Sequence, residues 1–198
     1  MFRRTHRQAD GIPVGQRGSA AADSPFHLTS RSIAVSGIIA ALYVVLTMLL
    51  KPLAFGEMGF ECRVSEAMTL LPVLFPEAIP GLTIGCLISN LFSPVGPLDI
   101  IFGTLATLVA SVMSYLTRKI RLGSWKLPVV SATWPVLCNG LIIGGVLTVT
   151  EIFNSFPVAF LVVSVGEAVA LIIGLLLFPA FEEVAPRLIG GGSKQESE

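Results

Sequence analysis

Long stretches without charge constrain this chain more than any other feature. Residues 127–150 read LPVVSATWPVLCNGLIIGGVLTVT, a run of 24 residues with no charged side chain. A helix of about 20 apolar residues crosses the hydrocarbon core of a bilayer. Only 13% of the whole chain is charged, against about 25% in a typical soluble domain. The sequence therefore predicts an integral membrane protein whose immediate surroundings are the lipid bilayer.

Apolar segments of this kind recur six times, separated by short polar or proline-containing breaks. We expect a transmembrane helix in each segment, which predicts an all-α protein built as a compact bundle of six helices. The second and third segments supply only about 12 to 15 apolar residues, fewer than a full span needs. Short, proline-interrupted segments often line a binding site. The expected helices cover residues 32–50, 64–79, 81–93, 97–117, 128–150 and 157–181.

Positive charges predict the orientation of this bundle. Residues 1–31, 118–126 and 182–198 together hold eleven Lys and Arg, whereas two, Lys51 and Arg63, lie in the first loop on the other side. Because Lys and Arg gather on the cytoplasmic side, both termini are expected in the cytoplasm. We therefore place residues 32–181 as a multi-pass domain in the cytoplasmic membrane of a bacterial or archaeal cell.

Both ends of the chain are expected to be solvated tails. Residues 1–31 are polar, basic and rich in Gly and Pro, which predicts a disordered cytoplasmic segment. Arg3 and Arg4 are not promptly followed by an apolar core, so a cleaved signal peptide is not expected. Residues 182–198 end in GGGSKQESE and are expected to form a cytoplasmic C-terminal tail.

Polar side chains in or beside the apolar segments are the candidate binding residues. On the predicted topology they lie at the outer mouth or near the middle of the helices. An ionisable group in hydrocarbon costs at least about 2.5 kcal/mol, so it usually has a binding or pairing role. The candidate substrate-binding residues are Phe60, Glu61, Arg63, Glu66, Asn90, Asp99, Asn139 and Glu167.

Several candidates also have a purely local explanation. Glu66 lies three residues after Arg63, a spacing that allows an ion pair on one helix face. Asp99 follows Pro97 and could cap the fourth helix. Asn90 could equally cap the end of the third helix.

The remaining candidates have structural alternatives of their own. Glu167 lies near the middle of the last expected helix and could hydrogen-bond to Asn139 on the helix before it. Phe55 and Phe60 could anchor the outer loop at the membrane interface. The same aromatic side chains could instead stack on a ring of a ligand.

Small residues in the first helix form a second pattern. Ser36 and Ala40, and Gly37 and Ala41, are pairs with small-xxx-small spacing that lets another helix approach closely. They lie in the cytoplasmic half, away from the polar candidates, which predicts a surface for a partner subunit. The alternative is that they pack against the protein's own helices.

Several functional classes are not expected from the sequence. Cys62, Cys86 and Cys138 show no CxxC spacing, and both histidines lie in the N-terminal tail, so no zinc or other metal site is predicted. The patterns GxxxxGK[ST], HExxH and GxSxG are all absent from the sequence. We therefore expect neither an enzyme nor a cofactor, and no nucleic-acid partner. If the protein transports a solute, the energy would come from another chain or from an ion gradient.

Several blocks in order along the chain resemble one family. They are ALYVVLTMLLKPLAFG, RVSEAMTLLPVLFPEAIPGLTIGCLISNL, DIIFGTLATLVAS and VGEAV. Over residues 32–181 the sequence is similar to the QueT family, the substrate-binding S components of energy-coupling-factor (ECF) transporters for queuosine precursors. The resemblance implies a six-helix bundle that captures a 7-deazaguanine from outside. It also implies docking, through the small residues of the first helix, on a transmembrane coupling subunit that carries two ATPase subunits, with delivery by toppling of the bundle.

The candidate residues suit such a ligand chemically. A 7-deazaguanine offers N1–H and NH₂ donors to a carboxylate such as Glu66 or Glu167, and Asn90 or Asn139 could read its O6 edge. The aminomethyl group of preQ1 is a cation, which suits a site with an excess of acidic residues. Three alternatives remain open: an S component for another vitamin, an ion-coupled permease with Glu167 as proton relay, and a membrane protein without a ligand.

Overall fold

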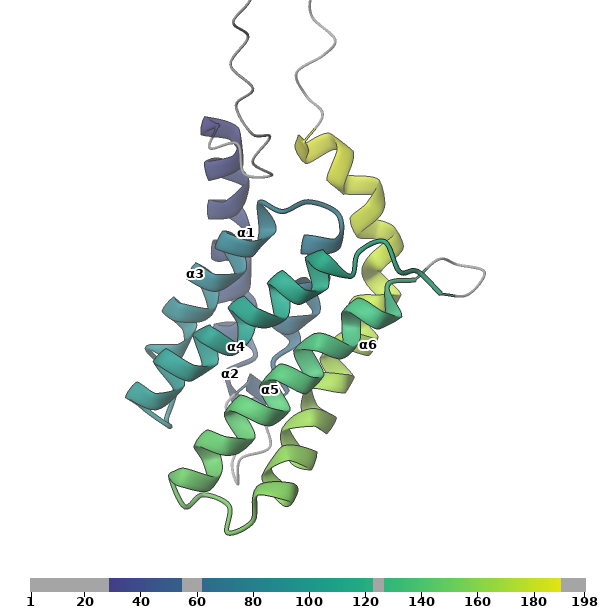
Figure 1. Ribbon diagram of the computed structural model, residues 1–198. Coiled ribbons are helices and arrows are strands. Elements are labelled where there is room, and N and C mark those ends of the chain that lie inside the picture. The colour runs from purple at the N-terminus through teal and green to yellow at the C-terminus, as the bar shows by residue number, and fades with distance from the viewer. Residues whose placement is uncertain (1–28, 55–61, 123–126, 190–198) are drawn as a thin grey trace, which may run out of the picture.

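The computed structural model describes residues 29–54, 62–122 and 127–189. Apart from one isolated bridge between Leu122 and Leu127, the secondary structure of these residues is entirely helical (Figure 1). This confirms the all-α prediction for the described part of the chain. The elements are α1 (Ser30–Leu49), α2 (Lys51–Ala54), the 3₁₀ helix η2 (Val64–Val73), α3 (Ala78–Asn90), α4 (Pro97–Leu116), α5 (Val129–Val149) and α6 (Phe156–Ile189).

Four of the six predicted spans are full-length helices in the described part of the chain. Among the described residues four helices, α1, α4, α5 and α6, are long and apolar enough to cross a membrane. The other two predicted spans are shorter apolar helices, because η2 has 10 residues and α3 has 13. At about 1.5 Å per residue α3 extends roughly 20 Å, less than a hydrocarbon core of about 30 Å. The protein is a multi-pass membrane bundle, whereas six full spans remain a prediction.

The second predicted helix is a 3₁₀ helix rather than an α-helix. A run of ten 3₁₀ residues is unusually long, since most such helices contain three or four. Pro72 lies inside it and has no N–H to donate. The 3₁₀ geometry rises about 2.0 Å per residue, so η2 extends roughly 20 Å, against about 15 Å for an α-helix of the same length. Every residue from Ser65 to Val73 is buried, which makes η2 the core element of the bundle.

The long helices alternate in direction around this element. In Figure 1, α1 and α5 run downwards and α4 and α6 run upwards, so the start of α1 and the end of α6 lie at the same end of the bundle. The turn between α5 and α6 lies at the opposite end. Both termini in the cytoplasm, as the sequence predicts, would require these two helix ends to lie on one side, and the cytoplasmic side remains assigned by the positive charges alone.

Apolar clusters on two sides of η2 hold the bundle together. Met68, Leu71 and Phe75 pack with α1 and α3 in one cluster. Leu70 and Val73 pack with α5 and α6 in a second cluster. Burial of such side chains contributes about 1.5–3 kcal/mol each, so η2 is fixed mainly by apolar contact on both faces.

The last helix is longer than expected. α6 continues to Ile189, eight residues beyond the predicted end of the span at residue 181, so part of the predicted C-terminal tail is helical. Pro179 and Pro186 lie inside it, and Figure 1 shows α6 changing direction in its last third, as an internal proline causes. Arg121, from the α4–α5 connection, forms an ion pair with Glu182 on this extension.

Candidate functional site

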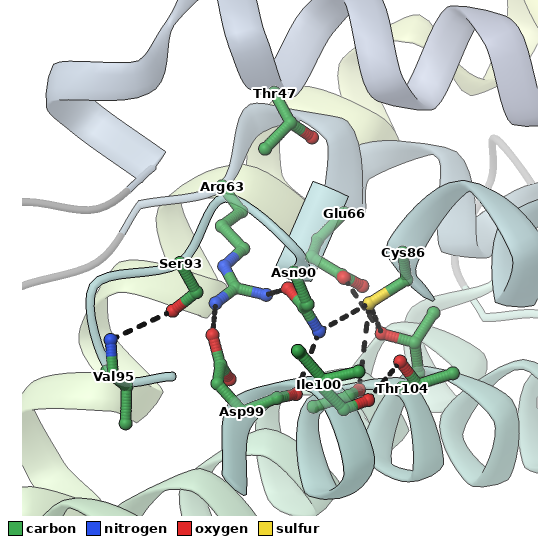
Figure 2. A network of polar contacts seen from close by, with 12 residues as sticks. Thr47, Arg63, Glu66, Cys86, Asn90, Ser93, Val95, Asp99, Ile100 and Thr104 are labelled. Atoms are coloured by element: carbon green, nitrogen blue, oxygen red, sulfur yellow. Dashed lines mark hydrogen bonds and ion pairs between the residues drawn. The ribbon is translucent and has the colours of Figure 1, made fainter. Parts of the chain in front are cut away.

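An ion pair ties the start of η2 to α4 (Figure 2). Arg63 lies just before η2, and its Nη2 donates a hydrogen bond of 2.8 Å to Asp99 Oδ2 in the first turn of α4. Arg63 Nη1 donates to Asn90 Oδ1, also at 2.8 Å. All three residues are at most 5% exposed. Buried charges require such partners, because desolvation costs several kcal/mol per ion.

Asn90 connects this ion pair to the backbone of α4. Its side-chain Nδ2 donates to the carbonyl of Asp99 at 3.0 Å and lies 3.4 Å from Cys86 Sγ. Gly103 makes room for the amide, since a Cβ there would lie 2.6 Å from Asn90 Nδ2. Neither capping alternative describes these side chains. The N-cap of α4 is Gly96 and no side chain caps it, while the Asn90 side chain is directed to α4.

Glu66 forms the second centre of the network. Its Oε1 accepts hydrogen bonds from the hydroxyl of Tyr43 on α1 and, at 3.1 Å, from the hydroxyl of Thr107 on α4. Glu66 Oε2 is buried and has no hydrogen-bond partner among the described residues. The Thr107 hydroxyl also lies 3.2 Å from Cys86 Sγ, so Cys86 connects the Glu66 centre to Asn90.

A third contact extends the network along α1. Thr47 Oγ1 lies 2.7 Å from Ser65 Oγ, and the Thr47 hydroxyl also bonds the carbonyl of Tyr43 at 2.8 Å. Both side chains are buried. Tyr43 and Thr47 follow Val35 and Ile39 at intervals of four residues, so the buried face of α1 changes from apolar to polar beside η2.

The two candidates on α5 and α6 are also buried. Asn139 donates through Nδ2 to the carbonyl of Pro135 in its own helix at 3.1 Å. Glu167 is 5% exposed on α6. Burial, and in second place the charge of Glu167, raises the pKa of the Cys62 thiol. Because its charge acts on Cys62, Glu167 lies near the segment that precedes Arg63 and η2.

The structure thus brings most of the sequence candidates together. Arg63, Glu66, Asn90 and Asp99 belong to one hydrogen-bonded network, and Asn139 and Glu167 are buried on neighbouring helices. Phe60 and Glu61, with Phe55, lie outside the described residues.

Sequence reasoning missed five members of the network, which are Tyr43, Thr47, Ser65, Cys86 and Thr107. One signal was available for Thr107, because Asp99, Gly103 and Thr107 recur every fourth residue and so share a face of α4.

Small residues of α1 divide between two faces. Ser36 donates to the carbonyl of Glu77 at 2.8 Å, and Ala40 is 7% exposed. Both face α3, where Gly81 and Gly85 leave room for the α1 backbone. Gly37 and Ala41 are exposed, and a Cβ at Gly37 would meet nothing within 4 Å. Of the predicted partner surface, only Gly37 and Ala41 are directed outwards.

A comparison with protein families identifies the relatives of this chain. The family model described as QueT transporter matches residues 33–183, which is more than half of the sequence. The chain belongs to the QueT family. The network of Arg63, Glu66, Asn90 and Asp99 lies inside the matched region. Membership of a transporter family agrees with the buried polar network and the apolar helices.

One curated relative in the QueT family carries a functional name. The Queuosine precursor transporter QueT of Lactococcus lactis subsp. cremoris (strain MG1363) is 42% identical over 79 residues. The alignment covers 39% of this chain and 45% of that protein, less than half of either. No solved structure matches the chain.

Proposed function

We propose that this QueT-family protein is the substrate-capture subunit of an ECF importer and binds a 7-deazaguanine queuosine precursor. One observation carries the proposal: a connected network of buried polar and charged groups inside a membrane bundle. Such groups are expensive in hydrocarbon, so a role in recognition explains why they are retained. The name of the Lactococcus relative agrees with this substrate class.

The groups in the network complement the edges of a 7-deazaguanine. Carboxylate oxygens of Glu66 and Glu167 accept N–H donors, while the amide of Asn139, which donates to the carbonyl of Pro135, has a second N–H for a carbonyl such as O6. On the predicted topology the network lies towards the outer face of the membrane. An outward-facing pocket that captures the ligand without ATP fits this arrangement.

Delivery of the ligand would need a partner, which we propose to be the transmembrane coupling subunit with its two ATPase subunits. An apolar groove of about 540 Å³ lies between α1 and α6 over η2. Ile38, Leu42 and Val45 of α1 line it and are about half exposed. Gly37 and Ala41 continue the same outward surface. A transmembrane helix of the coupling subunit, lying in the groove and across these small residues, would bury both.

Ligand binding by the purified protein tests the proposed function. We expect a heat of binding and a rise in unfolding temperature with at least one of preQ0, preQ1 and queuine, with no nucleotide or metal added. No response to any of the three contradicts the proposal. Mass spectrometry of ligands that co-purify with the protein would then identify another vitamin or an unrelated solute.

A further inference from the structure

We infer that Glu66 recognises a primary amine of the ligand through one carboxylate oxygen, and that Tyr43 is the positioning residue that leaves this oxygen free. This inference rests on the proposed function and adds to it the substrate class: a 7-deazaguanine that carries an amine. It depends on how the two oxygens of Glu66 differ. Oε1 accepts from Tyr43 and Thr107, whereas Oε2 is buried without a hydrogen-bond partner among the described residues.

The number of free oxygens decides which part of the ligand Glu66 can contact. The guanine-like edge presents two parallel donors, N1–H and NH₂, and a carboxylate pairs with both only when each of its oxygens is available. Oε1 of Glu66 already accepts two hydrogen bonds. Glu66 can therefore offer a single strong acceptor, which suits an ammonium group better than the two-donor edge.

The charge of the network favours a cationic group as well. Asp99 is paired with Arg63 at 2.8 Å. The described residues of the network hold two carboxyl groups, Glu66 and Asp99, and one guanidinium, so Arg63 cannot balance both carboxyl groups once both are ionised. An uncompensated buried charge is strongly destabilising, and an ammonium group next to Oε2 would neutralise it.

Tyr43 can hold Glu66 in place because its own ring is fixed. The residue is fully buried, and Gly85 of α3 lies directly against it. A Cβ at Gly85 would be 2.8 Å from Tyr43 Cβ and 3.1 Å from Cγ, so the absence of a side chain admits the ring. The Tyr43 hydroxyl thus donates from a fixed point, which orients Oε1 towards α1 and Thr107 and leaves Oε2 on the other side of the carboxylate.

A pair of ligands that share one ring tests the inference. preQ1 carries an aminomethyl group where preQ0 carries a nitrile, and calorimetry on the purified full-length protein gives the affinity for each. We expect the wild-type protein to bind preQ1 more tightly. Glu66→Gln should weaken preQ1 binding roughly ten- to a hundredfold and preQ0 binding only a few-fold, so the ratio of the two affinities collapses.

Tyr43→Phe should lower the same ratio by about tenfold, because the carboxylate loses the donor that orients it. Tyr115→Phe is the matched control, since it removes the same hydroxyl from a tyrosine near the end of α4, whose ring contacts Arg118 rather than Glu66. A purely structural effect would weaken the binding of both ligands equally, so the ratio of their affinities would not change. Equal wild-type affinities, or a ratio that Glu66→Gln and Tyr43→Phe leave unchanged, overturns the inference. A protein that binds queuine but neither preQ0 nor preQ1 also overturns the inference, whereas absence of binding to all three overturns the proposed function instead.

Discussion

Arg63 and Asp99 are 36 residues apart in sequence, and Arg63 Nη2 lies 2.8 Å from Asp99 Oδ2. The contact joins the residue before η2 to the first turn of α4, and both side chains are almost completely buried. It attaches the start of the 3₁₀ helix by charge, whereas much of the helix is held by apolar packing. Its strength should therefore determine how firmly the first turn of η2 is held.

Asp99→Ala should destabilise the protein strongly. Removing one partner of a buried pair leaves the other charge uncompensated, so we expect the free energy of unfolding to fall by about 3–5 kcal/mol. Unfolding of the detergent-purified protein, followed by circular dichroism, measures the change.

The ion pair between Arg121 and Glu182 provides the matched control. Its side chains are 28% and 41% exposed, so water screens the interaction. Glu182→Ala should lower the free energy of unfolding by less than about 1 kcal/mol. If the two variants lose the same free energy of unfolding, burial does not make the Arg63–Asp99 pair stronger than the exposed Arg121–Glu182 pair.

Much of the fold was predictable because apolar runs mark helices in a membrane. The expected helix at 97–117 agrees with α4 (Pro97–Leu116), and that at 128–150 with α5 (Val129–Val149), each to within one residue. Proline and polar breaks set these limits locally, so no knowledge of the tertiary structure was needed. The sequence also predicted that η2 and α3 are short, because their apolar segments contain fewer residues than a full span needs.

The pairing of side chains was not predictable in this way. Arg63 has Glu66 three residues away but pairs with Asp99, because the choice depends on which helix packs beside η2. The 3₁₀ geometry of η2 was not predicted either, since the apolar run predicted a helix without determining its type. The orientation of the small residues depends on how α1 is rotated against α3. Their spacing in the sequence did not determine which pair faces outwards.

Glu167→Gln should weaken ligand binding roughly ten- to a hundredfold. A buried charge-assisted hydrogen bond is worth about 1.5–3 kcal/mol, and Glu167 is buried about a third of the way along α6. Glu151→Gln is the control, since Glu151 is exposed between α5 and α6. Equal affinities of the two variants for the ligand, measured by calorimetry, would remove Glu167 from the site. Uptake that loses an imposed proton-gradient dependence in Glu167→Gln would favour an ion-coupled permease.

Gly85→Ala should destabilise the bundle. The new Cβ would lie 2.8 Å from Tyr43 Cβ and 3.0 Å from the carbonyl of Ala40, so α1 and α3 would have to move apart. Overpacking of this kind costs about 1–3 kcal/mol.

Gly145→Ala is the matched change on α5, where a Cβ meets nothing within 4 Å. We expect it to be neutral or to stabilise by up to about 1 kcal/mol, because alanine is the better helix former. Thermal unfolding of both variants decides the point. A Gly85→Ala protein as stable as the wild type would show that α1 and α3 do not approach as closely as the structure indicates.

The last prediction concerns the outward face of α1. Gly37→Trp and Ala41→Trp should abolish uptake in cells and co-purification with the coupling subunits, while the isolated protein keeps its ligand affinity within a few-fold. Both positions are exposed, and a Cβ at Gly37 would meet no other element of the described residues within 4 Å. A bulky side chain there would hold a partner helix away, at the cost of many small dispersion contacts. Ala40→Trp is the contrasting variant, because Ala40 is buried against α3, and it should lose folding and binding together. Affinity and pull-down measured on the same three variants decide the matter: if Gly37→Trp and Ala41→Trp lose both properties or neither, this face is not the coupling surface.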